Sequence, residues 1–589
     1  MNRASTIVVM VTVTALLSAC GSPPPGTGGK RNFGDRISYS PEQDDLINPE
    51  WLFAPFPADD PALADEDAVL VRHLVGEPRG LNPILCNSWF DFYFAVLLYG
   101  AVFVRDDNLE WVPSPDRVAK MVESDDRLRT TIHLAPGQTW HDGVPYTSHD
   151  VKFTWEAINN PDVPAYYYKH MVSQIVDIEI IDDLSFTFVH AKASPMNYQN
   201  MGFYVLPKHV WGKPEELAKD PTMTKSDYYT SLTRERVVGC GPYTFVEWKA
   251  ADRVIVDRWE DYPFAKPHFR RQILKVIPDR NTALLEFKKG DLDEIWLTPI
   301  QFATQSNDEA YRDVGVKAYG VRRMFAYMGW NMDGSNPFFT DERVRHALAY
   351  AHNSERVIQD LSYNLFTQST GIFDSEHWAY NPDVEPWPYN LEKAAELLDE
   401  AGWLVSDDDG YRYKVIDGEP VRFQFELLMA KSFDYSMPGV DIYRDDLRKL
   451  GVTFDVRVIE NASFDSRYLR HEFQAIQSVW EVTHDPSKWK NHFHSEQHMT
   501  GRNVCGYNNP RVDELFDLTE SSFDREERTA YFQEIQELVF GEQPHLFLWN
   551  YSLTHGFNKR LRGVNMTPAG VFLYRPSQLA WWTPQEVAE

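Results

Sequence analysis

The stretch from Trp480 to His498, WEVTHDPSKWKNHFHSEQH, concentrates aromatic rings and titratable side chains more densely than any other part of the chain. It contains two Trp, four His and three carboxylates. Three kinds of chemistry are open to residues of these types at this spacing: catalysis, metal binding, or recognition of a ligand in a pocket.

Catalysis requires a nucleophile with its base, a pair of carboxylates, or a metal. The chain contains no G-x-S-x-G, H-E-x-x-H, P-loop or Gly-rich dinucleotide motif. The acidic run Asp407–Asp409 precedes Gly410, which is typical of a loop tip rather than of a catalytic pair. We therefore expect a protein that is not an enzyme and that needs no cofactor.

A metal site is the alternative interpretation of the His-rich half of this stretch. The spacing of His492, His494 and His498 places three imidazoles within reach of one ion. No cysteine and no second cluster accompanies them, and such spacing arises easily in a loop. We expect no metal here, and we keep these three histidines as the ligands if one is bound.

Composition and the N-terminus indicate a protein that works outside the cytoplasmic membrane. The formal net charge of −29 disfavours binding to nucleic acid, whose phosphates it repels. A basic residue, a short apolar run and LSAC at Leu17–Cys20 read as a signal peptide with a lipidation site at Cys20. The segment GSPPPGTGGK that follows has the composition of a flexible tether. We expect a lipid anchor on Cys20.

Cysteine is scarce in the rest of the chain. Cys86, Cys240 and Cys505 are an odd number, so at most one internal disulfide can form. Cys86 with Cys240 is the pair we expect if one does.

Hydrophobic patterns predict hairpins early in the chain and helices late. A strand is expected over Ala68–Val75, and two hairpins are expected to turn at Asp182–Asp183 and near Ala251–Asp252. HLFLWNY, from His545 onward, predicts a final strand that rejoins an earlier sheet.

Three helices have clear start or stop signals. Thr147 and Asp150 have the spacing of a capping box, and Asp524 with Glu527 has the same spacing. Asn390 predicts the start of a helix that Gly402 ends, and Gly541 with Pro544 predicts the end of the helix that follows Asp524.

Six segments, in order, resemble the extracellular solute-binding proteins of family 5, the peptide- and nickel-type receptors of ABC importers, which include dipeptide- and oligopeptide-binding proteins. They are IHLAPGQTWHDGVPYTSHDVKFTWEAI, VVGCGPYTFVEWKAADRVIVDR, IPDRNTALLEFKKGDLDEIW, MGWNMDGSNPFFTDERVRHALAYAHN, YNLEKAAELLDEAGW and GYNNPRVDELFDLTESSFDREER. Together they cover roughly residues 68 to 560, nearly the whole body.

The resemblance implies an α/β, two-lobed periplasmic-binding-protein fold with an extra N-terminal subdomain and the ligand enclosed between the lobes. The expected divisions are a signal peptide (1–19), a lipidated Cys with tether and extended arm (20–66), lobe I (67–325) with its subdomain around 106–235, lobe II (326–544) and a C-terminal return to lobe I (545–589). The segment RRMFAYMGWN, Arg322–Asn331, is the expected crossing between the lobes.

The resemblance also implies a function: a monomeric receptor in the periplasm or cell envelope that delivers a solute to an ABC permease. A peptide is the expected ligand, and an oligopeptide is favoured over a strict dipeptide. The alternative is a non-peptide solute such as an oligosaccharide, an opine, or a nickel or other metal chelate.

In the family, the segment that matches Trp480–His498 runs along the ligand cleft, so we expect residues of this stretch to contact the ligand. Trp480 and Asp485-Pro486 match a family segment in which an acid of dipeptide receptors holds the ligand ammonium, but the spacing is one residue shorter. Glu481 and Asp485 are therefore both candidates for that acid. Lys431 stands where dipeptide receptors place an Arg for the ligand carboxylate. Glu77 and Trp330 are the further expected contacts, although Trp330 suits a core equally well.

Overall fold

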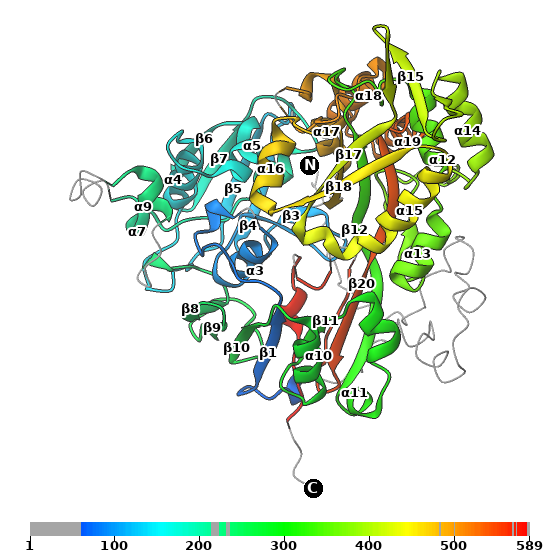
Figure 1. Cartoon of the computed structure of the whole chain (residues 1–589). Coiled ribbons are helices and arrows are strands. Elements are labelled where there is room, and N and C mark those ends of the chain that lie inside the picture. The colour runs from blue at the N-terminus through cyan, green and yellow to red at the C-terminus, as the bar shows by residue number, and fades with distance from the viewer. Residues whose placement is uncertain are drawn as a thin grey trace, which may run out of the picture.

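The computed structural model describes residues 61–86, 88–213, 223–230, 236–481, 485–499, 501–567, 570–572 and 574–585 (Figure 1). The predicted signal peptide, Cys20, the tether and most of the arm lie outside these residues. Within the described part, no helix combines the length and apolar character that a membrane crossing requires.

One large mixed sheet runs through the body. Its strands, in sheet order, are β18 (Thr453–Ile459), β17 (Gln424–Ala430), β19 (Ala475–Glu481), β12 (Gly315–Trp330), β20 (His545–Asn558), β11 (Glu294–Trp296), β1 (Val69–Leu74), β10 (Arg271–Val276), β9 (Arg253–Arg258) and β8 (Tyr243–Lys249), with β13 (Thr367–Gln368) paired to β20. We call the part from β11 to β8 lobe I, and the part from β18 to β19 lobe II.

The long strands β12 and β20 lie side by side in the middle of the sheet (Figure 1). In lobe I, Gly315–Val321 pairs with Ser552–Asn558. In lobe II, Phe325–Gly329 pairs with His545–Asn550 and also borders β19. The register shifts between Val321 and Phe325, within the segment expected to cross between lobes.

Three smaller sheets complete the strands. They are β4 (Val118–Glu123), β5 (Arg129–Leu134), β7 (Ser185–His190) and β6 (Ile175–Asp182); β14 (Leu404–Val405), β15 (Arg412–Ile416) and β16 (Glu419–Arg422); and β2 (Phe103–Arg105) with β3 (Trp111–Pro113). The four-stranded sheet lies within the expected subdomain, and we keep that name for residues 102–213.

Helices cover all three parts. Lobe I has α3 (Trp89–Leu98), α10 (Arg280–Lys288) and α11 (Glu309–Val314); the subdomain region has α4 (Ser148–Asn159), α5 (Tyr166–Met171), α6 (Asn197–Asn200), α7 (Lys208–Trp211) and, beyond it, α9 (Lys225–Thr230). Lobe II has α12 (Glu342–Tyr350), α13 (Ser354–Ser362), α14 (Leu391–Glu400), α15 (Met437–Lys449), α16 (Asn461–Leu469), α17 (Lys490–Phe493), α18 (Pro510–Ser521) and α19 (Arg525–Glu542).

The predicted helix signals hold with two exceptions. Asp524 caps α19, but the Glu527 carboxylate accepts from the Ser522 hydroxyl and does not complete the expected capping box. Thr147 and Asp150 form the capping box of α4, and the Asn390 side chain accepts from the Lys393 N–H at the start of α14. Gly402, just past the end of α14, has φ of +83°, which is the left-handed conformation expected at a helix stop. Gly541, however, does not end α19: the helix continues to Glu542, and Gln543 takes the left-handed position.

The two hairpins and the final strand are confirmed. β6 and β7 turn at Asp182–Asp183, β8 and β9 turn at Ala251–Asp252, and β20 joins the sheet between β12 and β11. The expected pairing of Cys86 with Cys240 is not made. Cys86, Cys240 and Cys505 are all free and buried, and burial raises the pKa of each thiol.

A buried ion triad joins the first strand of lobe I to the last. The Arg72 guanidinium on β1 lies 3.1 Å from the Glu294 carboxylate on β11, and His555 Nδ1 on β20 lies 2.8 Å from its other oxygen. Burial alone would raise the pKa of Glu294. The charge of Arg72 and the hydrogen bond with His555 outweigh burial, and the pKa lies below its usual value.

Buried histidines make the stability of the fold depend on pH. Burial lowers the pKa of His352 to about 4, and it lowers the pKa of His545, which stacks on Tyr327, to about 3. Below pH 6.5 the unfolded chain therefore binds protons that the folded protein does not, so the free energy of unfolding falls as the pH falls.

We predict that each of these two histidines removes on the order of 2 to 3 kcal/mol of stability between pH 7 and pH 4.5. Urea unfolding at both pH values measures this loss. His352→Gln should show a flatter pH dependence than the wild type. His149→Gln is the control because that side chain is 48% exposed; equal pH dependence in both variants would contradict the prediction.

Candidate functional site in the gap between the lobes

Side chains of the subdomain contact side chains of lobe II, and we use the word gap for the region between these contacts and the end of β19. Lys192 Nζ lies 2.6 Å from Glu520, and Arg525 lies 3.4 Å from Glu110. The guanidinium of Arg127 lies 3.9 Å from the centre of the Phe523 ring. Figure 1 shows the subdomain in blue and cyan beside the α17 and α18 segments of lobe II. These contacts hold the two bodies together at the end of α18.

The lobe II wall of this gap is the end of β19. The Trp480 indole N–H donates to the Tyr327 hydroxyl at 2.7 Å, which fixes the ring against the sheet. The Arg502 guanidinium lies 5.3 Å from the centre of that ring. Glu481, the next residue, pairs with Met324 of β12 and has an exposed side chain. Among the described residues its carboxylate forms no ion pair.

We take α5 as the part of the subdomain that belongs to this region, because the charge of Glu481 acts on Tyr167 of α5. Tyr167 packs against Phe92 at 5.0 Å between ring centres, and 46% of its surface is exposed. Desolvation of its hydroxyl raises the pKa of Tyr167. The positive charge of Arg105 lowers this pKa, and the negative charge of Glu481 raises it further. The charges that act on the Tyr167 hydroxyl therefore belong to both the subdomain and lobe II.

Asp485 forms an ion pair within lobe II. Its two oxygens lie 2.8 and 2.7 Å from an Arg528 nitrogen on α19, and it caps the short helix η8 (Pro486–Trp489) by accepting from the Ser487 N–H. Burial opposes ionisation, but the Arg528 charge outweighs it and lowers the pKa of Asp485. Of the two acids expected to hold an ammonium group, Glu481 is the one that faces solvent.

A lysine that the sequence analysis passed over lies beside Glu481. Burial lowers the pKa of Lys488, in η8, to about 8, although the charge of Glu481 raises it. The positive charges of Arg105 and Arg502 lower it further. Lys488 therefore lies among charges from the subdomain and from lobe II.

The other expected ligand contacts have structural partners. Glu77 accepts hydrogen bonds from the Trp248 indole and the Ala251 N–H, so it holds the β8–β9 turn. Lys431 lies on the surface, 3.0 Å from Glu460. Trp330 is fully buried against Phe339, which leaves none of its surface to a ligand: it belongs to the core of lobe II, the alternative that the sequence left open.

The three histidines kept as metal ligands do not converge. His492 is buried against the Trp480 ring at 4.3 Å between centres, and the His494 side chain accepts from the Glu496 N–H. His498 pairs with the Asn503 carbonyl at 2.9 Å. Among the described residues, no group of three His, Cys, Asp or Glu has the geometry of a metal site.

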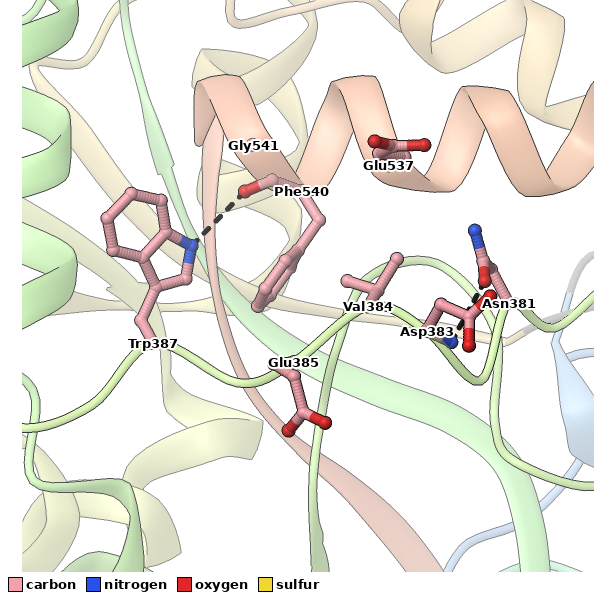
Figure 2. Close-up of a pocket in the computed structure, with 8 residues that line it drawn as sticks. All are labelled: Asn381, Asp383, Val384, Glu385, Trp387, Glu537, Phe540 and Gly541. Atoms are coloured by element: carbon pink, nitrogen blue, oxygen red, sulfur yellow. Dashed lines mark hydrogen bonds between the residues drawn. The ribbon is translucent and has the colours of Figure 1, made fainter.

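A separate pocket of about 480 Å³ lies elsewhere on lobe II (Figure 2). It is formed by α19 and the loop before α14, where the Trp387 indole N–H donates to the Phe540 carbonyl at 3.3 Å. None of its lining residues belongs to the gap.

These features describe a mixed α/β protein of two lobes that share one sheet, and comparison with known proteins agrees. The model of the bacterial extracellular solute-binding proteins, family 5 (middle), matches residues 83–499. The chain belongs to this family.

Relatives include the oligopeptide-binding protein AppA of Bacillus subtilis, which is 24% identical over 519 residues that cover 85% of this chain and 89% of AppA. The structure of AppA with a nonapeptide superposes with a TM-score of 0.73 at 22% identity, covering 89% of this chain and all of that one. NikZ of Campylobacter jejuni with Ni(L-His) superposes with a TM-score of 0.72 at 24% identity, covering 88% and 99%. The predicted two-lobed fold is confirmed.

We predict opposite behaviour for the two acids in unfolding experiments. Asp485→Asn removes one partner of a buried ion pair and should lower the free energy of unfolding by about 3 kcal/mol. Glu481→Gln, at an exposed carboxylate, should change it by less than about 0.5 kcal/mol. Urea unfolding of both variants at pH 7 measures the difference, and a loss of stability in Glu481→Gln as large as that in Asp485→Asn would refute these assignments.

Proposed function

We propose that this protein is the peptide receptor of an ABC importer. It captures a peptide in the gap between subdomain and lobe II, and it delivers the peptide to a membrane permease. An oligopeptide is favoured over a strict dipeptide. The observation that carries the proposal is the Glu481 carboxylate, which is exposed at the end of β19 and forms no ion pair with the described residues.

The chemistry of Glu481 suits the amino end of a peptide. A carboxylate that forms no ion pair with the described residues is available to accept charge-assisted hydrogen bonds from an ammonium group. The ring of Trp480, the preceding residue on β19, offers apolar surface to the first side chains of the peptide. Family membership and the similarity to AppA support a peptide as the ligand.

Closure of the gap follows from the contacts at its edge. The pairs Lys192–Glu520 and Arg525–Glu110 form only when the subdomain and α18–α19 are close, so they favour the closed arrangement. Each is an exposed pair worth little alone. A ligand that also contacts both bodies adds to them, and the closed protein presents one shape to the permease.

Isothermal titration calorimetry with a neutral pentapeptide tests this function. The free peptide should bind, and its N-acetylated form should bind at least about tenfold more weakly because the ammonium partner of Glu481 is gone. Glu481→Gln should erase that difference. At a hundredfold excess over Kd the free peptide should add about 2.7 kcal/mol to stability. Absence of binding by any free peptide, with binding of an oligosaccharide, opine or nickel chelate, refutes the proposal.

We further propose that the protein acts as a monomer in the periplasm or cell envelope, held to a membrane by a lipid on Cys20. The thiol and new amino group of Cys20 would carry the lipid, and the Pro/Gly tether would separate it from the body. Cys20→Ser should move the protein from the membrane fraction to the soluble envelope fraction. Retention of that variant in the membrane fraction contradicts the anchor.

A further inference from the structure

The pocket of about 480 Å³ on lobe II has no part in the function proposed above. It lies at the C-terminal end of α19, and none of its lining residues belongs to the gap. Figure 2 shows the helix on one side and the loop that carries Asp383, Val384 and Glu385 on the other. A volume of this size falls within the range of sites that bind small molecules. We call it the α19 pocket.

The α19 pocket has an excess of negative charge. Asp383 and Glu385 on the loop and Glu537 on the helix are exposed, and none of their carboxylates forms an ion pair with the described residues. No lysine or arginine is among the described residues that line the pocket. Glu534, one turn earlier on α19, differs because the Arg511 guanidinium lies 2.8 Å from its carboxylate. The three acids of the α19 pocket are therefore free to bind a cation.

The end of the helix adds to this charge. Phe540 and Gly541, which line the pocket, belong to the last turn of α19, and that turn contains no basic residue. The C-terminus of a helix carries a partial negative charge that favours a nearby cation. The backbone and the acidic side chains thus favour the same kind of ligand.

An indole ring forms a fixed wall of the α19 pocket. The Trp387 N–H donates to the Phe540 carbonyl at 3.3 Å, as Figure 2 shows. The ring of Tyr350 meets Trp387 edge-on at 4.9 Å between centres, and the ring of His346 lies 4.8 Å away. Trp is the side chain whose ring face attracts cations most strongly. Its fixed position lowers the entropy that a ligand must lose on binding.

A buried acceptor lies next to the α19 pocket. A second cavity, of about 10 Å³, shares Trp387 and Phe540 with the pocket, so the two adjoin. Gln543 lines this second cavity and is 1% exposed, and its Oε1 atom has no hydrogen-bond partner among the described residues. A buried acceptor without a donor costs free energy. This end of the pocket therefore favours a ligand that carries N–H donors.

We propose that the α19 pocket is a second binding site, separate from the gap, for a small organic cation with a guanidinium or ammonium head. The carboxylates of Asp383, Glu385 and Glu537 accept charge-assisted hydrogen bonds from the head. The apolar body of the cation packs on the rings of Trp387 and Phe540. The site does not depend on which ligand the gap binds.

Calorimetry with matched pairs of ligands tests the site. Butylguanidine is compared with butylurea, and phenethylamine with 2-phenylethanol, so each pair keeps the body and removes the charge. The cation of each pair should bind at least about tenfold more tightly than its neutral partner. Its affinity should fall at high salt, because the three carboxylates are exposed and their charge is screened.

Variants assign the binding to the α19 pocket. Glu537→Gln and Asp383→Asn should each weaken binding of both cations by about fivefold or more. Glu534→Gln is the matched control, since this carboxylate lies on the same helix but is already paired with Arg511. Glu481→Gln is the second control, because the exposed carboxylate of the gap is the other candidate for an ammonium group. Both controls should bind the cations as the wild type does, and thermal unfolding checks that each variant is folded.

The outcomes separate this site from the proposed function. Equal affinity within both pairs, or no binding of either cation at millimolar concentration, overturns the α19 pocket as a cation site and leaves the peptide receptor standing. Weaker cation binding in Glu481→Gln but not in Glu537→Gln places the cations in the gap and overturns it as well. Cation binding that Glu537→Gln weakens supports the site even where no peptide binds, and in that case the proposed function alone is overturned.

Discussion

Every other part of this protein is arranged around the antiparallel pairing of β12 with β20. The two strands run through both lobes, so their backbone hydrogen bonds connect the bodies that must enclose a ligand. The register shifts at two points in this ladder, between Val321 and Phe325 and again between Ala326 and Tyr327. A bulge of this kind lets a strand bend locally while the pairing on either side is kept. The lobes are thus joined by a ribbon that is stiff within each lobe and adaptable between them.

The gap combines two electrostatic arrangements with different purposes. At the edge, Lys192 and Arg525 meet carboxylates across the two bodies, which favours contact without fixing it permanently. Glu481, Lys488 and Arg502 form no ion pair among the described residues. Charges that pair with each other stabilise a closed shape, whereas charges without partners stay available for a ligand. Asp485 is one of the charges that are paired, because it forms an ion pair with Arg528 of lobe II.

Sequence patterns predicted the parts of the fold that depend on local chemistry. The capping residues of α4 and α14, the turn at Ala251–Asp252 and the final strand each depend on a few neighbouring residues. The end of α19 was placed one residue early because Gln543, not a glycine, adopts the left-handed conformation. The expected Cys86–Cys240 bond failed for a different reason: spacing along the chain does not say where two buried thiols lie.

The candidate site was predictable only in part. The residue types of Trp480 and Glu481 made them candidates from the sequence. No local pattern distinguished Glu481 from Asp485, because it is Arg528, 43 residues after Asp485, that pairs with Asp485 and not with Glu481. Lys488 lies in the same segment. Its lowered pKa depends on burial and on the charge of Arg105, which belongs to the subdomain. The run of three tyrosines that contains Tyr167 was the local feature of the sequence that could have indicated α5 as part of the candidate site.

The position of β20 has a consequence for how the chain becomes a protein. This strand is among the last elements made, yet it occupies the middle of the main sheet, between β12 and β11. Until it arrives, both halves of the sheet have an open edge, and the Arg72–Glu294–His555 triad lacks its third member. Pairings between such distant parts of a chain form slowly. The main sheet can therefore close only after His545–Asn558 has reached its place between β12 and β11.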